Sequence, residues 1–223
     1  MAFLLLAGLP RSAAAQTSCT VSLVLAIDVS SSVNASEFDL QMRGLARALR
    51  DPSIIGAIVG SGGVQAMAFE WSGRYQQVEI VPWTLLSTEI DVFAFASLIE
   101  SHARGHDEFP TALGYALGHA AVRFAHAPLR CARKVVDVSG DGVNNEGFEP
   151  SSAYANFEFA GVTVNGLVIA GERPDPVAYY REQVIRGPGS FVEVARDFDD
   201  YEAAMKRKLL REINGSALSY LSK

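Results

Sequence analysis

One apolar segment limits what this chain can fold into more than any other part of the sequence. Residues 21–27 carry no charge, and the segment ends at Asp28. A short, continuous apolar run is typical of a parallel strand that is buried on both faces of a sheet. Ser30 and Ser32 follow, so one carboxylate and two hydroxyls come directly after the strand. Because ligands of open α/β sheets bind outside the carboxyl ends of the strands, we expect a ligand site here.

A second apolar strand ends in the same way. Residues 134–139 lead into a Gly-Asp-Gly sequence, in which Asp141 lies at the tip of the strand. Thr111 lies between the two strands in the sequence, at the start of a helix-like segment that follows the loop at 104–110. Carboxylates and hydroxyls offer only oxygen, which hard cations such as Mg²⁺, Mn²⁺ and Ca²⁺ prefer as a ligand.

The two carboxylates would repel each other if the fold brought them together. At a separation of ~6 Å and an effective dielectric constant near 20, the repulsion is roughly 2–3 kcal/mol. Asp28 or Asp141 would then take up a proton unless a cation lay between them. This reasoning predicts a divalent cation site. The alternative for Asp-x-Ser-x-Ser alone is a helix cap or a turn, since Asp and Ser are common in both.

Asp-x-Ser-x-Ser, a distant Thr and a distant Asp-Gly together resemble the metal-ion-dependent adhesion site of von Willebrand factor A-type domains. The resemblance covers nearly all of the chain after residue 20, and it is closest to a bacterial subgroup of unknown function. The stretches similar to that subgroup are residues 25–33, 69–73, 81–83, 136–145, 165–167, 179–180, 187–191 and 208–213. The resemblance implies that Ser30, Ser32 and Thr111 contact the metal directly, whereas Asp28 and Asp141 often act through water.

The third element of the motif departs from the pattern of many relatives. They have Gly-Gly-Thr or Gly-Arg-Thr, whereas this chain has Phe109-Pro110-Thr111. Proline fixes φ and lacks an N–H, so the loop is expected to follow a different path and Thr111 is the ligand that depends most on it. Asn144 and Asn145 follow the Asp-Gly of the motif; they are interpreted either as rim or ligand residues or as ordinary turn residues.

The rest of the sequence alternates between strand and helix patterns. Strands are predicted at 21–27, 64–71, 76–83, 134–139, 162–170 and 191–195, and helices at 34–50, 88–103, 111–126, 149–161, 176–185 and 197–213. The second and third strands are expected to form a hairpin. The fold class predicted is α/β, with a doubly wound, mostly parallel six-stranded sheet in the order 3-2-1-4-5-6, one antiparallel edge strand and helices on both faces.

The two cysteines precede the two aspartates by similar distances. Cys19 lies near the start of the first strand and Cys131 near the start of the fourth. These strands are parallel neighbours in the predicted order, so the thiols could meet at the end of the sheet opposite the site. We predict a disulfide, which an oxidising compartment would favour. The alternative is two unpaired, buried thiols.

The first residues are interpreted as a signal peptide. Residues 1–15 contain a short apolar core and end in Ala13-Ala14-Ala15, a small-x-small cleavage site, although the usual positive region is missing. The alternative is a buried helix. Residues 16–223 are then the von Willebrand factor A-type domain, in the periplasm or secreted. No other stretch approaches the ~20 apolar residues needed to cross a bilayer, so no membrane span is expected.

Composition narrows the class of partner. The chain has 223 residues, 49% of them hydrophobic, and a formal net charge of −6. The sequence contains no basic cluster, so nucleic acid is not expected as a partner. The nearest candidate, residues 206–208 with Arg211, is interpreted as a solvated face of the last helix. The glycine-rich loop at 60–63 lacks Gly-Lys-Ser/Thr, so a phosphate-binding loop is not expected.

We therefore expect a divalent-metal-dependent protein-binding module of the cell envelope, for adhesion or assembly, and not an enzyme. A protein partner would supply an acidic residue that completes the coordination of the metal. Mg²⁺ is the expected cation, with Mn²⁺ or Ca²⁺ as alternatives. Two other functions stay open: a structural envelope protein with a vestigial metal site, and a metal-dependent hydrolase, which lacks an obvious general base.

Overall fold

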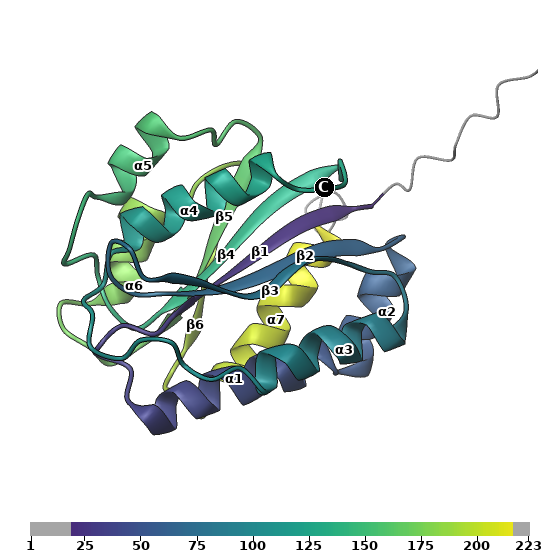
Figure 1. Cartoon of the computed structure of the whole chain (residues 1–223), viewed down its shortest axis with the longest axis horizontal. Coiled ribbons are helices and arrows are strands. Elements are labelled where there is room, and N and C mark those ends of the chain that lie inside the picture. The colour runs from purple at the N-terminus through teal and green to yellow at the C-terminus, as the bar shows by residue number, and fades with distance from the viewer. Residues whose placement is uncertain (1–18, 216–223) are drawn as a thin grey trace, which may run out of the picture.

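A six-stranded sheet forms the centre of the molecule, a computed structural model that describes residues 19–215 (Figure 1). The strands are β1 (Val21–Asp28), β2 (Val64–Trp71), β3 (Gln77–Leu86), β4 (Arg133–Gly140), β5 (Val162–Ile169) and β6 (Val192–Ala195). Their order is β3-β2-β1-β4-β5-β6; β2 and β3 pair antiparallel, and every other neighbouring pair is parallel. The predicted fold class is confirmed.

Helices cover both faces of the sheet. They are α1 (Ala35–Leu49), α2 (Pro52–Gly60), α3 (Glu89–Glu100), α4 (Leu113–Ala125), α5 (Pro150–Asn156), α6 (Pro176–Tyr179), the π-helical turn η1 (Tyr180–Val184) and α7 (Tyr201–Asn214). One core lies between the sheet and α1, α2, α3 and α7, and the other between the sheet and α4, α5 and η1. All eight residues of β1 are buried, as expected for a central strand with helices on both sides.

The helix after β1 begins as its sequence predicts. The Asn34 side chain accepts a hydrogen bond from the backbone N–H of Glu37 at 3.1 Å, and the Glu37 carboxylate accepts one from the backbone N–H of Asn34 at 2.8 Å. This reciprocal capping box satisfies donors that would otherwise be unpaired at the first turn of α1.

Several other helix boundaries differ from the prediction. The helix α2 was not among the predicted elements; its first turn is capped by the Asp51 side chain. The helix predicted at 149–161 ends at Asn156, because Phe157 is extended and its ring packs over Gly118 of α4. The helix predicted at 176–185 is divided between α6 and η1, and α7 begins four residues later than predicted.

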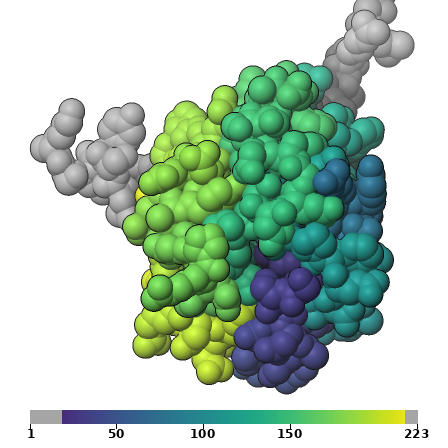
Figure 2. All heavy atoms as spheres, turned by 90° about the vertical axis from the view of Figure 1, so that its left-hand side faces the viewer, coloured from purple at the N-terminus to yellow at the C-terminus, as the bar shows by residue number. Residues whose placement is uncertain are grey.

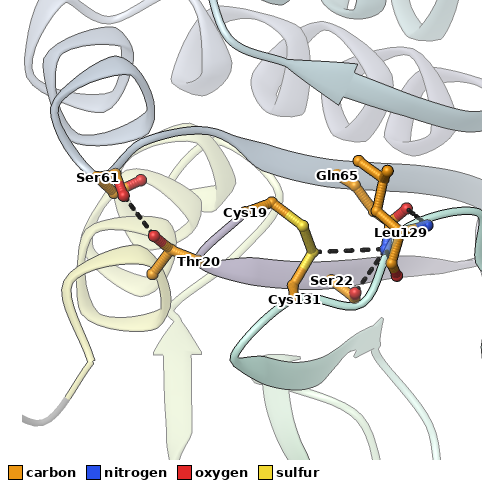
Figure 3. Close-up of a disulfide and its surroundings, with 7 residues drawn as sticks. All are labelled: Cys19, Thr20, Ser22, Ser61, Gln65, Leu129 and Cys131. Atoms are coloured by element: carbon orange, nitrogen blue, oxygen red, sulfur yellow. Dashed lines mark hydrogen bonds between the residues drawn. A yellow bond between two sulfur atoms is a disulfide. The ribbon is translucent and has the colours of Figure 1, made fainter. Parts of the chain in front are cut away.

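The predicted disulfide is present at the amino ends of β1 and β4 (Figure 3). The Cα atoms of Cys19 and Cys131 are 4.6 Å apart, and their separation in the sequence is 112 residues. Gln65 lies beside the bridge and donates to the Ser22 hydroxyl at 2.7 Å and to the Leu129 carbonyl at 2.8 Å. The alternative of two free thiols is therefore wrong.

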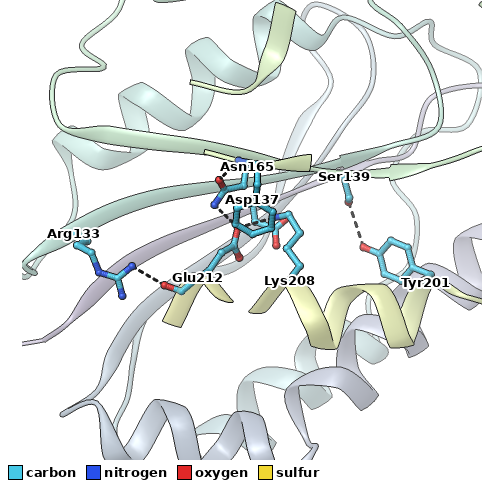
Figure 4. Close-up of polar contacts among 8 residues, drawn as sticks. Arg133, Asp137, Ser139, Asn165, Tyr201, Lys208 and Glu212 are labelled. Carbon is cyan, nitrogen blue, oxygen red and sulfur yellow. Dashed lines mark hydrogen bonds and ion pairs between the residues drawn. The ribbon is translucent and has the colours of Figure 1, made fainter. Parts of the chain in front are cut away.

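The interpretation of residues 206–208 as a solvated face is wrong for Lys208. Its side chain is fully buried under α7, and its Nζ lies 2.7 Å from Asp137 of β4 and 2.6 Å from Glu212 (Figure 4). Asn165 of β5 also donates to Glu212 at 2.9 Å. Helical periodicity places Lys208 on the sheet-facing side of α7, where the two carboxylates compensate its charge.

No helix within residues 19–215 is both long and apolar enough to span a bilayer. The predicted signal peptide at 1–15 lies outside the residues that the structure describes.

Candidate metal centre

The two predicted acidic strand tips lie at the same edge of the sheet. β1 and β4 are parallel neighbours in which Ile27 pairs with Ser139, so Asp28 and Asp141 emerge side by side. Figure 2 shows the molecule from the left-hand side of Figure 1. In this view the segment after β1, coloured purple, reaches the surface between segments coloured teal and green. Ser32 is exposed, whereas Asp28, Ser30, Thr111 and Asp141 are buried, so the group opens to solvent on one side.

A chain of hydrogen bonds joins the predicted ligands. The Thr111 hydroxyl donates to the Ser30 hydroxyl at 3.2 Å, the Ser30 and Ser32 hydroxyl oxygens are 3.1 Å apart, and Ser32 donates to Asp141 Oδ1 at 2.8 Å. Asp28 Oδ1 accepts from the backbone N–H of Ser30 at 2.8 Å. The structure therefore brings the five side chains together. Their role as metal ligands stays a prediction.

Burial leaves the two carboxylates in electrostatic conflict. The pKa of Asp28 is raised to about 8, first by its burial and then by the charge of Asp141. The pKa of Asp141 is also raised, mainly by burial, with further contributions from Glu172 and Glu37. A cation between the two groups would reverse this trend by stabilising both ionised forms.

The donor set fits a hard divalent cation. Asp28 Oδ2 is buried and has no hydrogen-bond partner among the residues that the structure describes, so this carboxylate has unused capacity as a ligand or acceptor. Within the described part of the chain, no group of three or more His, Cys, Asp or Glu side chains could hold a metal. The centre therefore depends on hydroxyl oxygens beside the two carboxylates, an all-oxygen set that suits Mg²⁺, Mn²⁺ or Ca²⁺.

Arg104, which the sequence analysis missed, supports the loop after β1. Its Nη2 donates to the backbone carbonyls of Val29 at 2.7 Å and Ser30 at 3.0 Å. The backbone N–H of Ser31 also donates to the Phe109 carbonyl at 2.8 Å. These hydrogen bonds hold the loop after β1 against the loop at 104–110, which is far away in the sequence. A lone arginine in a loop carries no sequence signal for such a role.

The open question about Asn144 and Asn145 has a structural answer. Asn145 Oδ1 accepts from the backbone N–H of Thr111 at 2.9 Å, and Asn144 Oδ1 accepts from the backbone N–H of Gly114 at 3.3 Å. Both side chains therefore hold the segment that carries Thr111. Thr111 points into the hydroxyl chain even though Pro110 precedes it, and α4 begins only at Leu113.

Solved structures of von Willebrand factor A domains share this fold. Proximal thread matrix protein 1 from the mussel byssus, solved with a zinc-occupied MIDAS motif, is 19% identical with a TM-score of 0.67, over 89% of this chain and 49% of that one. The von Willebrand factor type A protein from Catenulispora acidiphila is 19% identical with a TM-score of 0.62, over 88% and 42%. The chain thus spans about half or less of the length of these two proteins.

A third similar structure is BatB, a conserved hypothetical protein from Bacteroides thetaiotaomicron. It is 16% identical with a TM-score of 0.55, and the match covers 87% of this chain and 98% of that one. No curated protein matches the chain. A family model matches residues 18–217, a range that includes the whole described structure. The chain belongs to the family described as "Protein of unknown function (DUF1194)", and its fold is that of a von Willebrand factor A-type domain.

Proposed function

We propose that this protein is a divalent-metal-dependent protein-binding module that acts in the periplasm or outside the cell. Ser30, Ser32 and Thr111 would hold the cation directly, and Asp28 and Asp141 would balance its charge. An acidic side chain from a protein partner would complete the coordination. The cation would supply a positive point of attachment for that carboxylate.

The single observation that carries this proposal is the chain of hydroxyls that ends on one buried carboxylate, Asp141, and lies beside a second, Asp28. The hydrogen bonds run from Thr111 through Ser30 and Ser32 to Asp141. Of these four side chains, only that of Ser32 belongs to an exposed residue. Neutral hydroxyl ligands leave a bound divalent ion with net positive character. The exposed end gives a partner's carboxylate a route to it. Mg²⁺ is the cation we propose, with Mn²⁺ or Ca²⁺ as alternatives.

A role in binding is favoured over hydrolysis by the surroundings of the centre. Within residues 19–215, no histidine forms a hydrogen bond to any of the five side chains. His102, which precedes Thr111 by nine residues, has its Nε2 atom 2.9 Å from the carboxylate of the buried Glu70. Within the described residues, the centre would therefore lack a histidine that could serve as general base for activating water.

The disulfide supports an extracytoplasmic location. Bonds such as Cys19–Cys131 form and persist in oxidising compartments, whereas cytosolic thiols are kept reduced. The signal peptide predicted at residues 1–15 is consistent with export.

The proposal is tested first by calorimetric titration of the metal-free protein with Mg²⁺, Mn²⁺, Ca²⁺ and Zn²⁺. We expect saturable binding by the wild type and its loss in Asp28→Ala. Asp39→Ala is the matched control, because Asp39 is exposed on α1 and pairs only with Arg43. Circular dichroism would establish that each variant is folded. A folded wild type that binds none of the four cations would refute the proposal.

The partner is tested in a second step. Immobilised wild type and Asp28→Ala would be exposed to exported proteins in Mg²⁺ and, separately, in EDTA. A supporting result is a protein retained only by the wild type with Mg²⁺, whose retention is lost on substitution of one of its own Asp or Glu residues. Retention that is equal in EDTA would favour the structural role instead.

A further inference from the structure

A buried tyrosine lies beside the metal centre without any assigned role. Tyr180 is the first residue of η1, and its side chain is fully buried in the core on the α4 face of the sheet. Its hydroxyl has no hydrogen-bond partner among residues 19–215. Asp28 Oδ2 is likewise buried without a partner. Unpaired buried polar atoms are uncommon in folded proteins, so two of them in one region need an explanation.

Two glycines place the Tyr180 ring over the sheet. A Cβ on Gly166 of β5 would lie 2.6 Å from Tyr180 Cδ1, so the ring crosses this strand where a side chain is absent. A Cβ on Gly140 of β4 would lie 2.6 Å from the Tyr180 hydroxyl and 2.8 Å from Asp28 Oδ2. The two unpaired oxygens therefore border the same small space beside Gly140.

The chemistry of the two groups is complementary. The phenol of Tyr180 has a proton to donate at neutral pH. An ionised Asp28 can only accept. Hydrogen bonds from a second layer of residues orient the side chains that ligate a metal, and their loss commonly lowers metal affinity.

We propose that Tyr180 is a positioning residue for the metal centre: its hydroxyl donates to Asp28 Oδ2, directly or through one buried water, and fixes that carboxylate for the cation. This inference rests on the proposed function. It gives the η1 turn a role in orienting Asp28, a role that none of the five motif residues has. The glycines at 140 and 166 are then required for access of the phenol to the centre.

The test compares two tyrosine-to-phenylalanine variants. Tyr180→Phe removes only the unpaired hydroxyl, and we expect Mg²⁺ affinity to fall by about 10-fold or more. In the metal-free structure this hydroxyl has no hydrogen-bond partner among the described residues, so its removal should leave the unfolding temperature of the metal-free variant unchanged or raise it. Tyr154→Phe is the matched control, since its hydroxyl donates to the Val184 carbonyl of the same turn. It should lower the unfolding temperature and leave Mg²⁺ affinity unchanged.

A crystal structure of the wild type with Mg²⁺ gives the second measurement. We expect the Tyr180 hydroxyl within about 3.2 Å of Asp28 Oδ2, or of one water bonded to both. The inference would be overturned, and the proposed function left standing, if Tyr180→Phe bound Mg²⁺ with wild-type affinity. The same holds if the phenol contacted neither Asp28 Oδ2 nor a water bonded to it. A wild type that binds no cation would overturn the inference together with the proposed function.

Discussion

Asn145 and Thr111 are joined by two hydrogen bonds that link the loop after β4 to the loop before α4. The backbone N–H of Thr111 donates to Asn145 Oδ1 at 2.9 Å, and the backbone N–H of Asn145 donates to the Thr111 carbonyl at 3.0 Å. Asn145, four residues after Asp141, thereby fixes the segment that carries Thr111, the member of the hydroxyl chain farthest along it from Asp141. This link explains how Thr111 keeps its place next to Pro110.

Asn145→Ala should therefore weaken metal binding although Asn145 is not a proposed ligand. The variant keeps the backbone bond but loses the side-chain acceptor that holds the Thr111 N–H. We expect Mg²⁺ affinity to fall by about 10-fold, as is common when support of a ligand is lost. Asn156→Ala is the control, because this exposed side chain donates only to Ser152 within α5. Equal affinities in both variants, measured by calorimetry, would contradict the proposed support.

The metal-free protein should lose stability through Asp28 as the pH rises. Its pKa is about 8 in the folded state against 3.8 ordinarily, so the folded protein binds the proton more tightly. This contribution is fully present below about pH 4 and is lost towards pH 8. Burial also raises the pKa of Glu212 to about 8, so Glu212 contributes in the same direction. Burial lowers the pKa of His119 from 6.5 to about 4, so His119 contributes a stability that increases with pH between these two values.

Comparison with Asp28→Asn isolates the effect of this one carboxyl. Denaturant unfolding of both proteins in EDTA should show a wild-type stability that falls more steeply between about pH 5 and pH 8. Mg²⁺ binds the ionised form, so it should raise the wild-type midpoint more at pH 8 than at pH 5. Parallel pH profiles for the two metal-free proteins would show that Asp28 is already ionised at pH 5.

Reduction of the disulfide should lower stability and leave the metal centre intact. Cys19 and Cys131 lie at the amino ends of β1 and β4, and the candidate ligands lie at or beyond the carboxyl ends. For a loop of this length the chain-entropy model allows about 4–5 kcal/mol, an upper value for many proteins. The paired Cys19→Ser and Cys131→Ser substitutions should lower the unfolding midpoint in urea. Calorimetry at a temperature where the variant is folded should give wild-type Mg²⁺ affinity.

Lys208→Met should be strongly destabilising although a long apolar stem replaces the lysine. The change leaves the fully buried Asp137 and Glu212 without the cation that lies 2.7 Å and 2.6 Å from them. Loss of one partner from a buried ionic group commonly costs about 3–5 kcal/mol. Lys206→Met on the same helix is the control, since its ion pair with Asp51 is partly exposed and should matter little. Similar urea midpoints for the two variants would show that Asp137 and Glu212 do not need the lysine.

Sequence reasoning succeeded where the signal was local. Apolar runs predicted the strands, and the helix predicted at 34–50 matches α1 together with its two cap residues, Asn34 and Arg50. It failed where packing decided: Lys208 lies on the buried side of α7, and the segment after Asp175 forms a short helix and a π-turn instead of one helix. The helical spacing of Lys208 can be read from the sequence, but its partner Asp137 on the distant strand β4, which compensates the buried charge, cannot.

The sequence by itself determined that Asp28, Ser30 and Ser32 follow one strand and that Asp141 ends another, because these spacings are local properties of the chain. The tertiary structure alone decided that Arg104 and Asn145 support the segments that carry them and that Tyr180 lies beside Asp28. These residues come from separate loops and a distant turn, and their contacts with the centre exist only because the parallel pairing of β1, β4 and β5 brings those segments to one edge of the sheet.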